Sequence, residues 1–168
     1  MDVAALLRET FDRIPPLVRS AVEDLSADQL ATPPADGANT IAWLVWHLTR
    51  IEDDHLAGAM GCPQVWEQDG WPERFGLAPG SMDTGYGHSA DEVRAVRAEA
   101  EDLVAYHEEV AERTADFVAG LGPDELDRVV DEDWDPPVTL GVRLVSVASD
   151  ALQHAGQAAY VRGLLSSD

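Results

Sequence analysis

The chain has 168 residues, 45% hydrophobic and 26% charged, which is typical of one ordinary globular domain over residues 1–168. Eleven basic residues against 32 acidic ones give a net charge of −21. This balance argues against binding to nucleic acid or to anionic membranes, because affinity for phosphate comes from basic side chains. It also repels anionic small molecules, except where a metal or an arginine reverses the field locally.

Residue usage also indicates the compartment and the kind of genome. All eleven basic residues are arginine, which together with abundant Ala, Val, Gly and Asp is typical of a GC-rich genome. The single cysteine, Cys62, excludes an intramolecular disulfide framework and favours a reducing compartment. The first residues lack the pattern of a signal peptide, and no apolar run reaches the length of a membrane span. We therefore expect a cytoplasmic protein.

Residues 3–25 place apolar side chains at helical spacing. Pro15 and Pro16 interrupt this pattern, because each proline removes an amide donor and its ring clashes with the preceding turn. The pattern predicts one kinked helix or two collinear pieces. Ser26 and Gln29 form a capping box that predicts a short helical turn, and residues 32–38 have the composition of a loop.

A second helix is predicted from residue 41 to about Met60. Asn39 or Thr40 caps its start, and Gly61 and Pro63 end it. Its first half is apolar on nearly all sides, so we expect it to be the most buried helix. The aromatic-rich connection over residues 61–89 is predicted to be an ordered loop over one end of the bundle, serving as a lid or a substrate wall.

Two further long helices are predicted. One follows the capping box of Ser89 and Glu92 and runs to about Ala119, and the other spans residues 140–165. Residues 131–137 between them read as an irregular or edge-strand segment. Four long helical segments predict an all-α four-helix bundle, and the long loops predict at least one crossover connection.

Polar side chains on two apolar helical faces predict a metal site. Asp150 and His154 are four residues apart on the last helix, so both point from one face. His47 lies within the apolar half of the second helix. Imidazole and carboxylate groups are ligands of zinc and related divalent metals. The alternative is a structural Asp150–His154 hydrogen bond with an unrelated buried His47.

The motifs Asn39-Thr-Ile-Ala-Trp-Leu-Val-Trp-His47 and His154-Ala-Gly-Gln157-Ala-Ala-Tyr160-Val-Arg-Gly163 carry a family resemblance. The whole chain resembles the DinB-like superfamily, and within it an actinobacterial branch related to the N-terminal domain of mycothiol-dependent maleylpyruvate isomerases. This resemblance implies a four-helix bundle, often dimeric, with a divalent metal held by three histidines. His47 and His154 match the first and last of these ligands, and Asp150 stands where the family usually has the middle histidine.

The resemblance implies a function as well. We expect a zinc or nickel enzyme acting on a small-molecule substrate, with mycothiol as thiol cosubstrate in S-transfer or isomerisation. We also expect it to form a homodimer. A metal-dependent hydrolase is the near alternative, and a non-catalytic bundle that binds a small ligand or a partner is the rival from another class.

Other polar residues are secondary candidates. Arg50 is predicted to bind a substrate carboxylate, and Gln157 to bond a ligand carboxylate or a water on the metal. His107 is the substitute ligand, although a role as a core histidine is favoured. His55 and His88 are expected at the surface.

Overall fold

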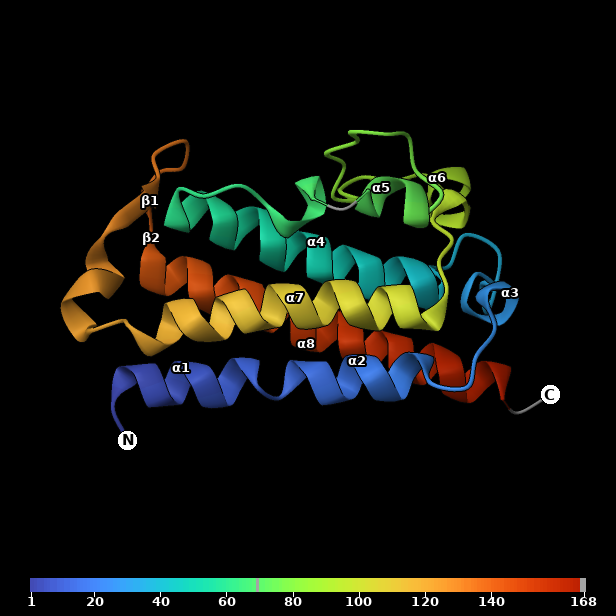
Figure 1. Cartoon of the computed structure of the whole chain (residues 1–168), viewed down its shortest axis with the longest axis horizontal. Helices are drawn as coiled ribbons and strands as arrows, with labels where there is room; N and C mark the ends of the chain where they lie inside the picture. Colours follow the sequence, from blue (N-terminus) through green and yellow to red (C-terminus); the bar gives the residue numbers. More distant parts are fainter. Residues whose placement is uncertain (69, 167–168) are drawn as a thin grey trace.

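The structure is a computed structural model that describes residues 1–68 and 70–166. Long helices pack side by side along one axis (Figure 1), which confirms the predicted all-α four-helix bundle. The helices and strands are α1 (Val3–Phe11), α2 (Ile14–Val22), α3 (Ala27–Leu30), α4 (Ile41–Met60), η1 (Val65–Glu67), α5 (Trp71–Arg74), α6 (Ala90–Ala95), α7 (Ala100–Ala119), η2 (Pro123–Asp127), β1 (Val129–Asp131), β2 (Val138–Thr139) and α8 (Leu140–Leu165).

The first layer consists of α1 and α2, which follow each other end to end (Figure 1). This is the predicted arrangement of two collinear pieces. Pro15 and Pro16 lie in the first turn of α2, where amides have no partner inside the helix and a proline therefore removes nothing. The predicted capping box is also present, because Ser26 and Gln29 bond each other's backbone at the start of α3.

The central helix of the bundle is α4. The Thr40 hydroxyl accepts from the amide of Trp43 at its start, and Gly61 ends it in the left-handed conformation with φ 68°. Every residue from Ile41 to Arg50 is buried, as the sequence predicts. The helix therefore carries its polar side chains into the interior of the protein.

A long crossover joins α4 to α7, and these two helices run in the same direction (Figure 1). The crossover spans residues 61–99 and contains η1, α5 and α6. It lies along the flank of α4, which corrects the prediction that it covers an end of the bundle. The predicted crossover connection is confirmed.

The prediction of a single helix after Ser89 is wrong, because the chain leaves helical geometry between α6 and α7. Val96 is extended and fully buried. The amide of Arg97 bonds the carbonyl of Phe75 at 3.1 Å instead of a carbonyl one turn back. The helical hydrogen bonds lost here are replaced by a bond to the crossover and by apolar burial.

The last helix, α8, follows the short antiparallel hairpin of β1 and β2, in which Val129 pairs with Thr139. The predicted irregular segment is the loop of this hairpin. α8 runs antiparallel to α4, and its packing against α4 is the most extensive between any two elements. Among the described residues, no helix combines the length and the apolar character needed to cross a bilayer.

Two ionisable side chains are sealed in the core by α4 and α7. Glu52 accepts a hydrogen bond of 2.7 Å from the Thr114 hydroxyl, and Nδ1 of His107 lies 3.1 Å from the Thr49 hydroxyl. The second oxygen of Glu52 and Nε2 of His107 have no partner among the described residues. Burial raises the pKa of Glu52 to about 7 and lowers the pKa of His107 to about 4.

Glu52 should make the free energy of unfolding fall as pH rises. Between its ordinary pKa of 4.5 and its folded value near 7, the unfolded chain loses the proton that the folded chain keeps. The Glu52→Gln variant has no carboxyl group to titrate at this position. Its free energy of unfolding minus that of wild type should therefore increase on the order of 3 kcal/mol between about pH 5 and about pH 8. Urea unfolding at both pH values measures it.

His107 is common to both proteins, so its own titration cancels in the comparison. Glu109→Gln, at an exposed position of α7, is the matched control and should show no such dependence. A stability difference between Glu52→Gln and wild type that is the same at both pH values would contradict the raised pKa of Glu52.

Candidate metal centre

His47 of α4 meets Asp150 and His154 of α8 where the two helices pack together. One potential ligand atom from each residue lies within 4.8 Å of the others. Nε2 of His154 is 3.5 Å from Oδ1 of Asp150, and the two imidazole rings lie edge to face with centroids 4.9 Å apart. The structure therefore brings together the three residues that the sequence singles out.

Hydrogen bonds fix the orientation of both imidazoles. The Nδ1–H of His47 donates to the carbonyl of Thr84, because a carbonyl can only accept. Nδ1 of His154 bonds the amide oxygen of Gln157 at 2.8 Å. In the His47 ring this leaves Nε2 as the unprotonated nitrogen, which is the form that ligates a metal, whereas Nε2 of His154 faces Oδ1 of Asp150. Gln157 is thus a positioning partner of His154.

The carboxylate of Asp150 leaves an acceptor unused. Its Oδ2 is enclosed and has no hydrogen-bond partner among the described residues. A buried carboxylate oxygen without a partner is costly, and a cation between Asp150 and the two imidazoles would satisfy it. Two histidines and one carboxylate form a donor set of catalytic zinc sites, which keep a further coordination position open. The residues present fit a divalent metal.

The two histidines have opposite electrostatic surroundings. Burial lowers the pKa of His47, which favours its neutral form. The hydrogen bond to Asp150 raises the pKa of His154, and burial opposes this rise. Asp150 and His154 are partly exposed, with side chains 33% and 18% accessible, whereas His47 is buried. The two residues of α8 therefore form the solvent-accessible side of the cluster.

Residues 83–88 of the crossover form a turn over His47 that the sequence does not predict. The ring of Trp43 stacks on His47 at 4.5 Å, and its Nε1–H donates to Nδ1 of His88 at 3.0 Å. Nε2–H of His88 in turn donates to Asp83 at 2.7 Å. The prediction that His88 is at the surface is wrong, because its side chain is only 6% exposed.

Gly85 lies at the centre of this turn for two physical reasons. Its φ of 89° is in the left-handed region that favours glycine. A Cβ at this position would lie 2.9 Å from the Trp46 ring and 3.0 Å from both Trp43 and His47. The turn can approach the imidazole only because a side chain is missing here. The glycines of the crossover were the signal in the sequence, but their neighbours could not be read from it.

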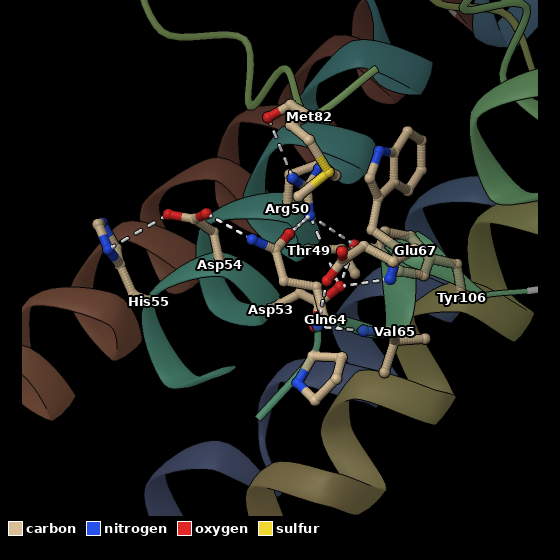
Figure 2. Close-up of polar contacts among 12 residues, drawn as sticks. Thr49, Arg50, Asp53, Asp54, His55, Gln64, Val65, Glu67, Met82 and Tyr106 are labelled. Carbon is tan, nitrogen blue, oxygen red and sulfur yellow. Dashed lines mark hydrogen bonds and ion pairs between the residues drawn. The ribbon is translucent and has the colours of Figure 1, made fainter. Parts of the chain in front are cut away.

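Arg50 has protein partners on all sides (Figure 2). Its fully buried guanidinium donates to the carbonyls of Met82 and Asp83, to Gln64 and to Tyr106. It therefore holds the crossover against α4. Its predicted role as the binder of a substrate carboxylate stays a prediction, and the guanidinium is completely buried beneath these partners.

The remaining candidates lie outside the cluster. His107 is bonded to Thr49 in the core, which matches the favoured role as a core histidine. His55 was expected at the surface but is half-buried against Arg143, which packs beside its ring. Asp54, between His55 and Gln64, accepts a hydrogen bond of 2.8 Å from the Gln64 amide (Figure 2).

Comparisons with known proteins identify the family and a solved structure with the same fold. The sequence model of the family described as MST, Mycothiol-S-transferase, matches residues 6–167. Among solved structures, the chain is similar to a conserved protein from Enterococcus faecalis, with 30% identity and a TM-score of 0.90 over 100% of this chain and 99% of that chain. A search of curated proteins finds no match.

Gly85→Ala should destabilise the protein and weaken metal binding, because the added methyl group pushes the turn away from Trp46 and His47. We expect a loss of roughly 1–3 kcal/mol in the free energy of unfolding. Loss of the Thr84 bond to His47 should reduce metal affinity by about tenfold or more. Urea unfolding and competition with a chromophoric chelator measure the two effects.

Gly87→Ala is the matched control. Gly87 also has a positive φ, 77°, but a Cβ there would meet no atom within 4 Å. It should show the backbone strain alone, with metal affinity retained. Equal effects of the two substitutions on stability and metal affinity would contradict the role of Gly85 in letting the turn pack closely over His47.

Proposed function

Because the chain belongs to the mycothiol S-transferase family, a DinB-like family, we propose that it is a divalent-metal-dependent thiol transferase or isomerase. The observation that carries this proposal is the cluster of His47, Asp150 and His154 with its unsatisfied carboxylate oxygen. In the proposed reaction the sulfur of a thiolate, the conjugate base of mycothiol, forms a bond to an electrophilic carbon of a small substrate. In substitution the bond from that carbon to the leaving group breaks, and the leaving group departs with the electron pair; in addition a double bond opens and the carbanion takes a proton. The thiol proton passes to solvent, to the leaving group or to that carbanion.

A divalent cation, zinc or nickel, would supply the positive charge that lowers the pKa of a thiol to near neutrality. The protein contributes orientation and access. His47 and His154 present Nε2, since their other nitrogens are engaged by Thr84 and Gln157. The exposed edge of Asp150 and His154 leaves an approach for thiol and electrophile. We propose that Gln157 contributes to catalysis by holding the His154 ring in position.

The test is metal content and thiol transfer measured on the same preparations. Protein purified without a histidine tag should hold about one zinc or nickel ion per chain, or bind it on addition. It should consume mycothiol with an electrophile such as monobromobimane faster than the uncatalysed reaction. His47→Ala and His154→Ala should each lose most of the metal and the catalysed rate, because two ligands hold a divalent ion poorly.

His107→Gln is the control for a histidine outside the cluster and should retain the metal. Asp150→His should tighten metal binding if Asp150 is a ligand. Metal below about 0.2 equivalents after zinc or nickel is added would overturn the metal enzyme and leave a non-catalytic ligand-binding bundle. Metal without thiol consumption, but with metal-dependent hydrolysis of esters or amides, would support the hydrolase alternative.

We also propose that the protein forms a homodimer through α8. Val142, Val145, Leu152, Tyr160 and Leu164 are exposed apolar side chains of this one helix. Exposed apolar surface of this extent on one element is typical of an interface.

The double variant Val145→Glu and Leu152→Glu should be a monomer in sedimentation velocity where the wild type is a dimer, because charges at the centre of an apolar interface are costly. Leu6→Glu, at an exposed apolar position of α1, is the control and should remain dimeric. A monomeric wild type at about 0.1 mM, well above the dissociation constants of stable dimers, would contradict the proposal.

A further inference from the structure

A polar cavity of about 390 Å³ lies between the second half of α4, the segment after it, the β-hairpin and the first half of α8. The charged and polar side chains that line it include those of Asp54, His55, Gln64, Glu67, Asp131 and Arg143. Its volume is within the range of sites for small ligands. None of these residues belongs to the cluster of His47, Asp150 and His154.

The cavity and the candidate metal centre lie along the same pair of helices, α4 and α8. Asp54 follows His47 by seven residues on α4, and Arg143 precedes Asp150 by seven on α8. Seven residues return to within about 20° of the same helix face and advance roughly 10 Å. Because the helices are antiparallel, both steps lead the same way along the contact between α4 and α8. The carboxylate of Asp150 also acts on the pKa of His55, which places the cavity within electrostatic reach of the centre.

Hydrogen bonds between neighbouring segments hold the cavity walls in place. Gln64 donates to Asp54 and accepts from Arg50, which ties the segment after α4 back to the helix (Figure 2). Arg143 donates to Asp131 at 2.6 Å and so ties the hairpin to α8. Its guanidinium also lies 3.3 Å from the ring of His55. Walls fixed in this way lose little conformational entropy when a ligand binds.

The charges of the cavity select the class of ligand. Asp54, Glu67 and Asp131 bring three carboxylates against the one guanidinium of Arg143. Burial, and next the charge of Arg143, lower the pKa of His55 and favour its neutral form. This lining repels carboxylates and phosphates but offers many acceptors, together with the donors of Gln64 and Arg143. Uncharged hydroxyl groups both donate and accept, so they suit such a surface.

We propose that this cavity binds the uncharged, polyhydroxylated part of the thiol cosubstrate while its sulfur reaches the centre at His47, Asp150 and His154. The inference rests on the proposed thiol-transfer function and adds the location of the sugar part and the basis of thiol selectivity. Mycothiol carries its cysteinyl group on hydroxyl-rich rings and has no carboxylate. Glutathione carries two carboxylates, which the cavity disfavours.

The test compares three thiols on the cobalt-loaded protein, in which a thiolate bound at the centre gives a charge-transfer absorption. The probes are mycothiol, N-acetylcysteamine, which is uncharged and lacks sugar, and glutathione. Wild type should bind mycothiol at least about tenfold more tightly than either of the others, as expected for a few added hydrogen bonds. Arg143→Gln and Asp54→Asn should each reduce the ratio of affinities for mycothiol and N-acetylcysteamine by about fivefold to tenfold.

Arg13→Gln, at an exposed position of the chain that does not line the cavity and is paired with Glu9, is the control and should keep the ratio of wild type. A ratio unchanged in both cavity variants would overturn the proposal even if all three thiols bind. A cobalt-loaded protein that gives no charge-transfer absorption with any thiol would count against the proposed function instead.

Saturation-transfer NMR of the mycothiol ring protons detects binding of the sugar part to the metal-free protein. A signal in wild type that is lost in Arg143→Gln supports the sugar site whatever the outcome at the metal centre. No signal in wild type overturns it. Circular dichroism of each variant shows whether the fold is retained, which separates loss of the cavity from loss of the fold. The conservative variant Asp131→Asn is measured in the same way.

Discussion

The buried pair of Arg50 and Asp53 is the interaction on which the site depends most. The guanidinium lies 3.6 Å from the carboxylate, and both side chains are almost completely buried. Burying two charges is costly unless further hydrogen bonds satisfy them. Here the crossover supplies these bonds, since Asp53 accepts from the amides of Val65 and Trp66 while Arg50 donates to backbone carbonyls. Removing either partner would leave an isolated buried charge, at a cost of about 3–5 kcal/mol.

This pair determines how the candidate metal centre is oriented. Arg50 holds the carbonyl of Asp83, and the next carbonyl along the chain, that of Thr84, accepts the proton of His47. Asp83 also bonds His88, and His88 accepts from Trp43, whose ring stacks on His47. The position of one imidazole thus depends on a buried charge one helical turn away. A core interaction and a possible ligand of a metal belong to one hydrogen-bonded network.

The parts of the fold that depend on local sequence could be predicted. Helix spacing, the cap at Thr40 and the capping box of Ser26 act over a few residues, so they are visible in the chain. His47, Asp150 and His154 were recognisable because they interrupt apolar faces. The break before α7 was not predictable, because Arg97 exchanges a helical bond for one to a residue far away in the sequence.

The roles of charged and loop residues were harder to predict for the same reason. Arg50 reads as a free cation because its acceptors are backbone carbonyls of a distant segment, and a carbonyl leaves no mark in the sequence. The sequence predicts an exposed His88 because loop residues are usually at the surface. The side chain is buried where the turn around Gly85 packs closely against α4.

The charges around the candidate metal centre differ from those of the cavity beside it. Two neutral imidazoles and one carboxylate would leave a bound divalent cation with one net positive charge, which a single thiolate neutralises. The adjoining cavity is lined by more carboxylates than cations, so it disfavours any second negative charge on the same ligand. In a protein of net charge −21, a cosubstrate that arrives neutral and becomes anionic only at its sulfur meets the least repulsion along this path. A metal at the proposed centre would thus favour ionisation of the thiol, whereas the carboxylates of the cavity disfavour a second negative charge on the same ligand.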